Sequence, residues 1–321
     1  MAVRVAEEWF TICAGCEITI LDIGEPLLDI LPKLEFVHMP VLMDHKLFGQ
    51  TGDQAGPEIP EADVGIISGG IRVEENREIA EEMRKKCNTL IALGSCACYG
   101  GLPALANQFT VDELQDKIFR GSVTTDSADT PNQEVSPFTD RIYALHEVVK
   151  VDLKLPGCPT TPEMVVEALT ALLEGREIDL PTKSVCDECP TIRKEKAIAN
   201  LKRPLESVEF EVGKPLDTVR CFMEQGFLCN GPATKSGCGG ADKTPRCVKA
   251  YMPCRGCFGP LSDTANPLVD MMGALSSIGL DVKQIPDRAA TFNRFCGAGR
   301  LRPLPKKELN HGKNTNNSTR H

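Results

Sequence analysis

Cysteine is the residue type in this sequence with the clearest chemical potential. The chain of 321 residues contains 15 cysteines, an odd number that cannot all pair in disulfides. The first pair is reached by Cys13, which leaves no room for a secretory signal, so we expect a cytoplasmic protein whose thiols stay reduced. Reduced thiols bind zinc or iron, and their spacing has to decide between these metals.

Four cysteines follow predicted strands in the first half of the chain. Cys13 and Cys16 form a C-x-x-C pair after the first strand, Cys96 follows the fourth strand and Cys158 the fifth. The loops at the carboxyl ends of parallel strands converge on one crevice, so these thiols can meet. Four thiolates suit zinc or a 4Fe-4S cluster. One pair plus two single cysteines, with glycines beside them that let the backbone approach a bulky group, favours the cluster.

The elements that must position these cysteines alternate between strands and helices. Short apolar strands are predicted at residues 3–10, 34–39, 64–67, 89–93 and 151–155. Helical patterns lie between or after them, at residues 17–30, 74–86, 141–149 and 162–173. This alternation predicts an α/β domain with a doubly wound, mainly parallel sheet over residues 1–178.

Regular structure becomes sparse after about residue 180, where helical periodicity is found only at 192–201 and 266–278. Eight cysteines lie between residues 186 and 257: Cys186, Cys189, Cys221, Cys229, Cys238, Cys247, Cys254 and Cys257. They suffice for two four-cysteine sites, either two more 4Fe-4S clusters or two structural zinc sites. We expect an irregular cysteine-rich domain over residues 179–300 that bound metal stabilises, and a polar tail over 301–321.

Three short motifs carry a family resemblance. The first C-x-x-C, the G-x-C-x-x-x-G-G at Gly94 to Gly101 and the P-G-C-P at Pro156 to Pro159 together resemble the small subunit of nickel-iron hydrogenases. The resemblance implies a flavodoxin-like first domain whose four cysteines hold the proximal 4Fe-4S cluster: Cys13, Cys16, Cys96 and Cys158.

The resemblance also divides the later cysteines into two sets. The implied distal set is Cys186, Cys189, Cys221 and Cys229. The implied medial set is Cys238, Cys247, Cys254 and Cys257. Periplasmic members of the family have histidine where this chain has Cys186 and proline where it has Cys247, so both differences favour three all-cysteine 4Fe-4S clusters.

Within the family, the chain resembles the cytoplasmic methyl-viologen-reducing hydrogenases of methanogenic archaea, which do not reduce deazaflavin. This implies a nickel-iron large subunit where hydrogen is split, no bond chemistry on this chain, and electron delivery through a 2Fe-2S subunit to heterodisulfide reductase. Small subunits of sulfhydrogenases and of deazaflavin-reducing hydrogenases are related alternatives. A respiratory-complex subunit of the same fold and, from another class, a zinc-stabilised interaction protein are further alternatives.

Three other cysteines, Cys87, Cys98 and Cys296, have no partner set, and we expect them to be buried without binding metal. If Ala97 is extended, the Cys98 side chain leaves the backbone about 6.6 Å from that of Cys96.

Net charge and hydropathy exclude two kinds of partner. The net charge of -9 argues against nucleic acid, and no apolar run approaches the ~20 residues of a membrane span.

Overall fold

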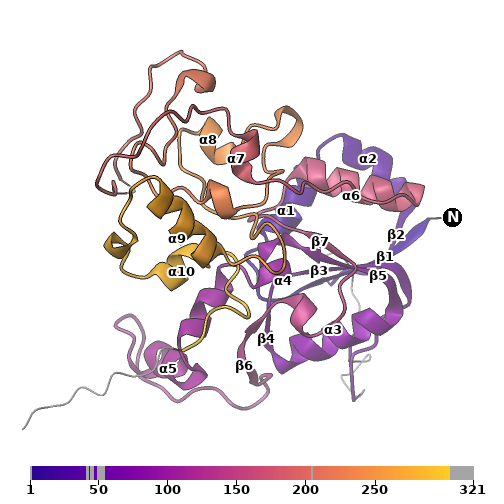
Figure 1. Ribbon diagram of the computed structural model, residues 1–321. Helices are drawn as coiled ribbons and strands as arrows, with labels where there is room; N and C mark the ends of the chain where they lie inside the picture. The colour runs from indigo at the N-terminus through magenta and orange to yellow at the C-terminus, as the bar shows by residue number, and fades with distance from the viewer. Residues whose placement is uncertain (1, 41–42, 44–46, 49–54, 204, 304–321) are drawn as a thin grey trace, which may run out of the picture.

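The computed structural model describes residues 2–40, 43, 47–48, 55–203 and 205–303. Its centre is a five-stranded sheet in the order β2-β1-β3-β5-β7, with every pairing parallel (Figure 1). The strands are β1 (Val3–Trp9), β2 (Leu34–His38), β3 (Ala62–Ser68), β5 (Cys87–Leu93) and β7 (Leu153–Leu155). This is the flavodoxin-like strand order, so the predicted fold class is confirmed.

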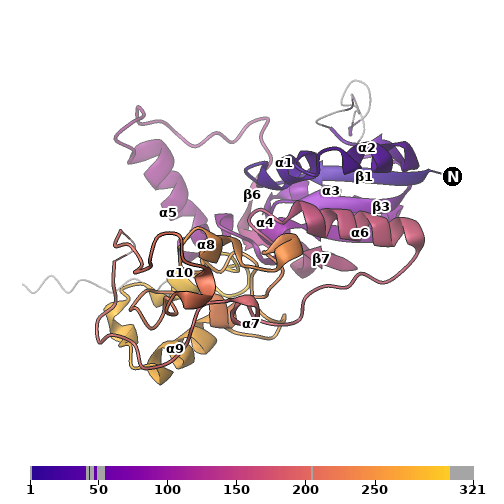
Figure 2. The same cartoon turned by 90° about the horizontal axis from the view of Figure 1, so that it is seen from above.

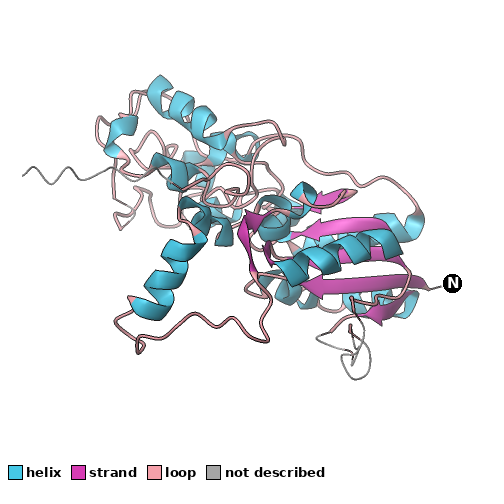
Figure 3. Cartoon of the chain, turned by 90° about the horizontal axis from the view of Figure 1, so that it is seen from below, coloured by secondary structure: helices cyan, strands magenta, loops and turns pink. Residues whose placement is uncertain are grey.

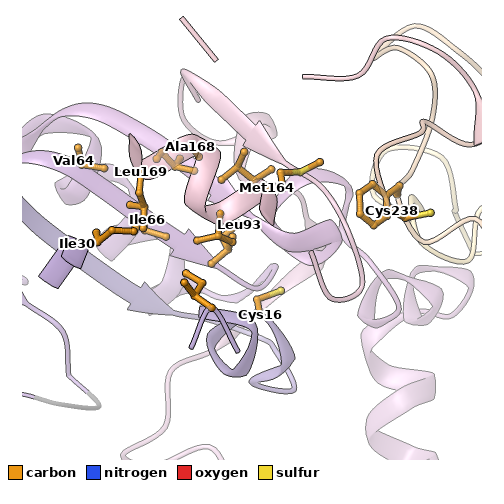
Figure 4. Packing of buried hydrophobic residues seen from close by; sticks show 14 of the residues in the cluster. Cys16, Ile30, Val64, Ile66, Leu93, Met164, Ala168, Leu169 and Cys238 are labelled. Atoms are coloured by element: carbon orange, nitrogen blue, oxygen red, sulfur yellow. The ribbon is translucent and has the colours of Figure 1, made fainter. Parts of the chain in front are cut away.

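Helices cover both faces of the sheet. On one face lie α1 (Gly15–Leu21), α2 (Pro26–Ile30) and α6 (Pro162–Glu174), and on the other lies α3 (Glu74–Lys86). Figure 4 shows the first face, where Ile66 and Leu93 of the sheet pack near Leu169 of α6. A sheet buried on both faces holds its strand ends rigidly, and the predicted ligands follow those ends.

Two helices predicted in the first half differ in the structure. The pattern at 17–30 forms two helices, because Gly24 takes a left-handed φ of 72° and Pro26 starts α2. The helix predicted at 141–149 was wrong. Those residues form part of β6 (Phe138–Tyr143), which pairs antiparallel with β4 (Ile71–Val73), and a 3₁₀ turn. Pairing with a distant strand overrides the local pattern.

The segment between β5 and β6 begins with the buried helix α4 (Gly94–Tyr99) and a 3₁₀ stretch (Pro103–Gln108). It continues through α5 (Val111–Gln115) into a π-helical turn (Asp116–Arg120). Figures 2 and 3 show α5 standing away from the sheet and a long loop returning to β6. No helix among the described residues is long and apolar enough to cross a membrane.

The cysteine-rich half has short helices joined by turns: α7 (Val185–Glu188), α8 (Arg246–Lys249), α9 (Pro267–Ser277) and α10 (Arg288–Phe292). The pattern at 266–278 matches α9, but the helix predicted at 192–201 was wrong. Its backbone bonds to other segments instead, with the N–H of Ile192 donating to Val219 and that of Ala197 donating to Ile278. The predicted tail beyond residue 303 lies outside the described residues.

The two halves share apolar packing. Met164 of α6 belongs to the same buried cluster as Val185, Cys238 and Phe258 of the cysteine-rich half. Figure 4 shows Cys238 at the end of this cluster, beyond Met164. The predicted boundary at 178/179 therefore lies in a connection between two packed regions, and it stays a prediction.

Candidate metal centres

The first four predicted ligands lie together at the carboxyl end of the sheet. Cys13 is exposed before α1, Cys16 is buried in the first turn of α1, Cys96 is buried in α4 and Cys158 follows β7. Burial, followed by the neighbouring thiols of Cys158 and Cys13, raises the pKa of Cys96 to about 12. Burial also raises the pKa of Cys16 to about 12, with contributions that include Cys96 and Cys158. These mutual effects require the four thiols to be near neighbours.

Two glycines keep the space beside these thiols free of side chains. A Cβ at Gly94 would lie 2.2 Å from Cys16 Sγ, and one at Gly101 would lie 2.5 Å from Cys96 Sγ. Both glycines have positive φ, of 78° and 55°. Any other residue would be strained and would collide with a thiol, which explains the glycines of the G-x-C-x-x-x-G-G motif.

Two buried carboxylates lie close to this set, and the sequence analysis missed them. Glu7 of β1 is 1% exposed and Glu17 of α1 is 6% exposed. Trp9 Nε1 donates to Glu7 Oε1 at 3.3 Å, whereas neither oxygen of Glu17 has a hydrogen-bond partner among the described residues. Burial, followed by the charge of Glu17, raises the pKa of Glu7 to about 7. The sequence feature that could have identified Glu7 is an acidic residue in a strand that is covered on both faces, where apolar residues are the rule.

The predicted distal set surrounds one cavity. Cys186, Cys189, Cys221 and Cys229 all line a hollow of about 270 Å³. Burial raises the pKa of Cys229 to about 12, and the thiols of Cys186 and Cys221 contribute. Arg193 Nη2 donates to Cys186 Sγ at 3.3 Å, so a cationic group lies at the edge of this site.

The predicted medial set also gathers in one place. Burial, followed by the thiols of Cys247 and Cys238, raises the pKa of Cys257 to about 12. The pKa of Cys254 is raised by burial, then by Cys229, Cys257 and Cys247. Cys247 is positioned by α8, and the remaining ligands lie in turns.

Direct contacts join the medial set to both other sets. The backbone N–H of Cys254 donates to Cys229 Sγ of the distal set at 3.2 Å. On the other side, Ser95, next to Cys96 of the proximal set, donates from its hydroxyl to the carbonyl oxygen of Cys257 at 2.5 Å. The three sets therefore lie in the order proximal, medial, distal.

The other three cysteines are buried away from these sets. Cys98 is fully buried and its Sγ donates to the carbonyl of Ala92 at 3.3 Å. Ala97 is not extended, because residues 94–99 form α4. On a helix, positions two apart point about 200° from each other, so Cys98 faces away from Cys96. Cys87 and Cys296 are also buried.

The donor sets fit iron-sulfur clusters better than single ions. Across the residues that the structure describes, no three His, Cys, Asp or Glu side chains are grouped closely enough to hold one metal ion. A zinc site needs four sulfurs at about 2.3 Å from one point. The cavity of about 270 Å³ between the distal thiols instead suits a polynuclear group. The raised thiol pKa values mean that metal uptake must release protons.

Comparisons with known proteins agree with this architecture. The family described as NADH ubiquinone oxidoreductase, 20 Kd subunit, matches residues 13–172, which contain the first four thiols. A subunit of the vhu F420-non-reducing hydrogenase of Methanocaldococcus jannaschii is 38% identical over 92% of this chain and 95% of its own length. The iron-sulfur subunit of the F420-non-reducing hydrogenase of Archaeoglobus profundus is 31% identical over 88% of this chain and 89% of its own length.

A solved structure has a similar fold over about half of the chain. The NAD+-reducing NiFe-hydrogenase in the H2-reduced state contains a chain that matches with a TM-score of 0.51 and 33% identity, covering 56% of this chain and 96% of that chain. A flavodoxin-like sheet with thiols at its strand ends, followed by a cysteine-rich half, thus defines an iron-sulfur small subunit of a hydrogenase, an oxidoreductase acting on H2. The chain belongs to the family of small subunits of F420-non-reducing hydrogenases, and it pairs with a large catalytic subunit. The predicted resemblance is confirmed.

Proposed function

We propose that this chain holds three 4Fe-4S clusters in series and conducts electrons from hydrogen oxidation on the large subunit to an acceptor protein. The observation that carries the proposal is the pair of contacts that joins the three thiol sets, through Cys257 on one side and Cys254 on the other. When bound, such clusters accept and release single electrons. The residues of this chain hold the clusters and set their order, and none of them is proposed to be catalytic.

Twelve thiolates are the proposed ligands. The proximal cluster takes Cys13, Cys16, Cys96 and Cys158. The medial cluster takes Cys238, Cys247, Cys254 and Cys257. The distal cluster takes Cys186, Cys189, Cys221 and Cys229. An all-thiolate distal set carries more negative charge than one with a histidine, which favours a low reduction potential and suits a low-potential acceptor.

The large subunit is proposed to cover the surface around Cys13. Cys13 is exposed, and on the adjacent α1 Ile18 is 55% exposed and Leu21 is 70% exposed. Apolar side chains gathered on one helix face beside a ligand are typical of a protein interface. Hydrogen oxidation at nickel-iron on the other side of this interface would then deliver electrons to the proximal set first.

The acceptor is proposed to dock at the opposite end, where Arg193 is exposed beside the distal cavity. Relatives named as not reducing F420 support a protein acceptor, and we propose a 2Fe-2S subunit that feeds heterodisulfide reductase in methanogenesis. We also propose that the complex works in the cytoplasm.

Anaerobic purification of the untagged complex tests this function. We expect a brown complex with about twelve irons per chain and attached subunits that include a nickel-iron large subunit and a 2Fe-2S protein. Hydrogen should reduce the 2Fe-2S protein and leave deazaflavin unreduced. Colourless protein with zinc would contradict the cluster assignment, whereas deazaflavin or sulfur reduction would contradict only the assigned acceptor.

A further inference from the structure

Ser95 lies at the place where three ligand loops meet. It is 1% exposed and precedes Cys96 in α4. Its hydroxyl accepts a hydrogen bond from the backbone N–H of Gly157 at 3.1 Å and donates one to the carbonyl oxygen of Cys257 at 2.5 Å. The backbone N–H of Ser95 also donates to the carbonyl of Gly157 at 2.7 Å. One side chain thus ties together the loops that carry Cys96, Cys158 and Cys257.

These bonds cross from one thiol set to the next. Ser95 and Gly157 belong to the proximal loops, whereas Cys257 is a proposed medial ligand 162 residues further along the chain. Cys257 is therefore tied to the proximal loops through its carbonyl oxygen.

A side chain without a hydroxyl could not make these two bonds. Gly157 has a φ of 136°, and a Cβ there would lie 2.4 Å from the Cα of Thr160, so its loop cannot easily shift to find another partner. An alanine at 95 would leave the Gly157 N–H and the Cys257 carbonyl without the partner that both now use. Buried polar groups without partners favour local displacement of the loops.

We propose that Ser95 is a positioning residue that sets the separation between the proximal and medial thiol sets and, through it, electron exchange between the two clusters. This inference rests on the proposed function, because it assumes clusters at both sets. It concerns the junction between two sites, and Ser95 is not a ligand of either.

The test compares four forms of the anaerobically purified complex with its large subunit: the parent, Ser95→Ala, Ser95→Thr and Ser68→Ala. Ser68 is the matched control, since it is fully buried at the end of β3 and its hydroxyl has no hydrogen-bond partner among the described residues. Ser95→Thr keeps a hydroxyl that can make both bonds. Iron content, magnetic coupling between the reduced clusters and amide exchange at Gly157 are measured in each form.

We expect Ser95→Ala to keep its irons but to lose or change the spin coupling between the proximal and medial clusters. The Gly157 amide should exchange about tenfold faster, as expected when one buried hydrogen bond is lost. Hydrogen-driven dye reduction should be slower than in the parent, and Ser95→Thr and Ser68→Ala should behave like the parent.

Two results would overturn the inference. In one, Ser95→Ala shows the coupling and Gly157 exchange of Ser68→Ala. In the other, Ser95→Ala fails to fold or loses a whole cluster and Ser95→Thr does the same, which would make the position a determinant of assembly rather than of spacing. A parent complex with fewer than three clusters would instead reject the proposed function, before any variant is compared.

Discussion

The sheet region and the cysteine-rich region assemble their thiols in different ways. In the first, strands and helices bury large side chains such as Ile67, Met83 and Leu90, and the ligands occupy strand ends that this core already fixes. In the second, the two described α-helices between residues 184 and 258 have four residues each, and the other backbone hydrogen bonds either close short turns or join loops far apart in the sequence. The sheet can hold its ligand loops without metal, whereas the cysteine-rich region has little regular structure to hold its own.

Removal of all metal should give the largest contrast between the two regions. In the metal-free chain, amides between 184 and 258 should lose about a thousandfold or more of their exchange protection, equivalent to ~4 kcal/mol, while β3 and β5 stay protected. Hydrogen exchange resolved by residue measures both. Equal loss of protection in the two regions would show that the sheet also depends on metal.

Loss of a single proximal ligand should lower the iron content of the chain. Cys96→Ser should also weaken assembly with the large subunit, because its thiol helps to tie the loops after β1, β5 and β7 together. Cys98→Ala is the matched control two residues away and should keep its full iron content. Iron analysis and size-exclusion chromatography with the large subunit measure these effects. A stable Cys96→Ser complex with full iron would reject Cys96 as a ligand.

Loss of the proposed medial ligand Cys247 should change the iron content only slightly. We expect Cys247→Ala to lose about one iron, because a 4Fe-4S cluster that lacks one thiolate commonly releases that iron and remains as a 3Fe-4S cluster. Electron paramagnetic resonance of the oxidised protein detects this conversion. If three 4Fe-4S clusters persist, Cys247 is not the fourth medial ligand and the division of the later cysteines is wrong.

The smallest predicted effect is on the stability of the sheet region and involves no loss of iron. Glu7 is buried and its pKa is raised from 4.5 to about 7, so the folded protein keeps a proton that the unfolded chain releases between these pH values. Stability is therefore full below pH 4.5 and falls as the pH rises to 7. Glu7→Gln should remove this loss and stabilise the protein at pH 8 by about 2–3 kcal/mol, with little effect near pH 4.5.

Urea unfolding followed by Trp9 fluorescence measures this effect, because Trp9 is the single tryptophan and lies in β1 beside Glu7. Glu35→Gln, at an exposed position of β2, serves as the control. A Glu7→Gln variant whose stability changes with pH as the parent's does would show that Glu7 does not carry the buried proton.

Much of the sheet region was predictable because its signals are local. Short apolar runs, mostly followed by glycine, proline or cysteine, located all five strands of the parallel sheet, and the 74–86 pattern coincides with α3. Side-chain periodicity is a property of neighbouring residues, so it can be read before the fold is known. The helices predicted at 141–149 and 192–201 were wrong because their backbones pair with residues far along the chain.

The sequence by itself determined the cysteine positions, the glycines that leave room for thiols and the alternation that brings strand ends together. Only the tertiary structure decided which sets touch: Cys254 against Cys229, and Ser95 against Cys257. It also placed Glu7 and Glu17 in the interior and turned Cys98 away from Cys96 through the helical backbone of α4. Hydrogen bonds between irregular loops depend on the folded positions of residues up to 162 places apart, and no local pattern encodes those positions.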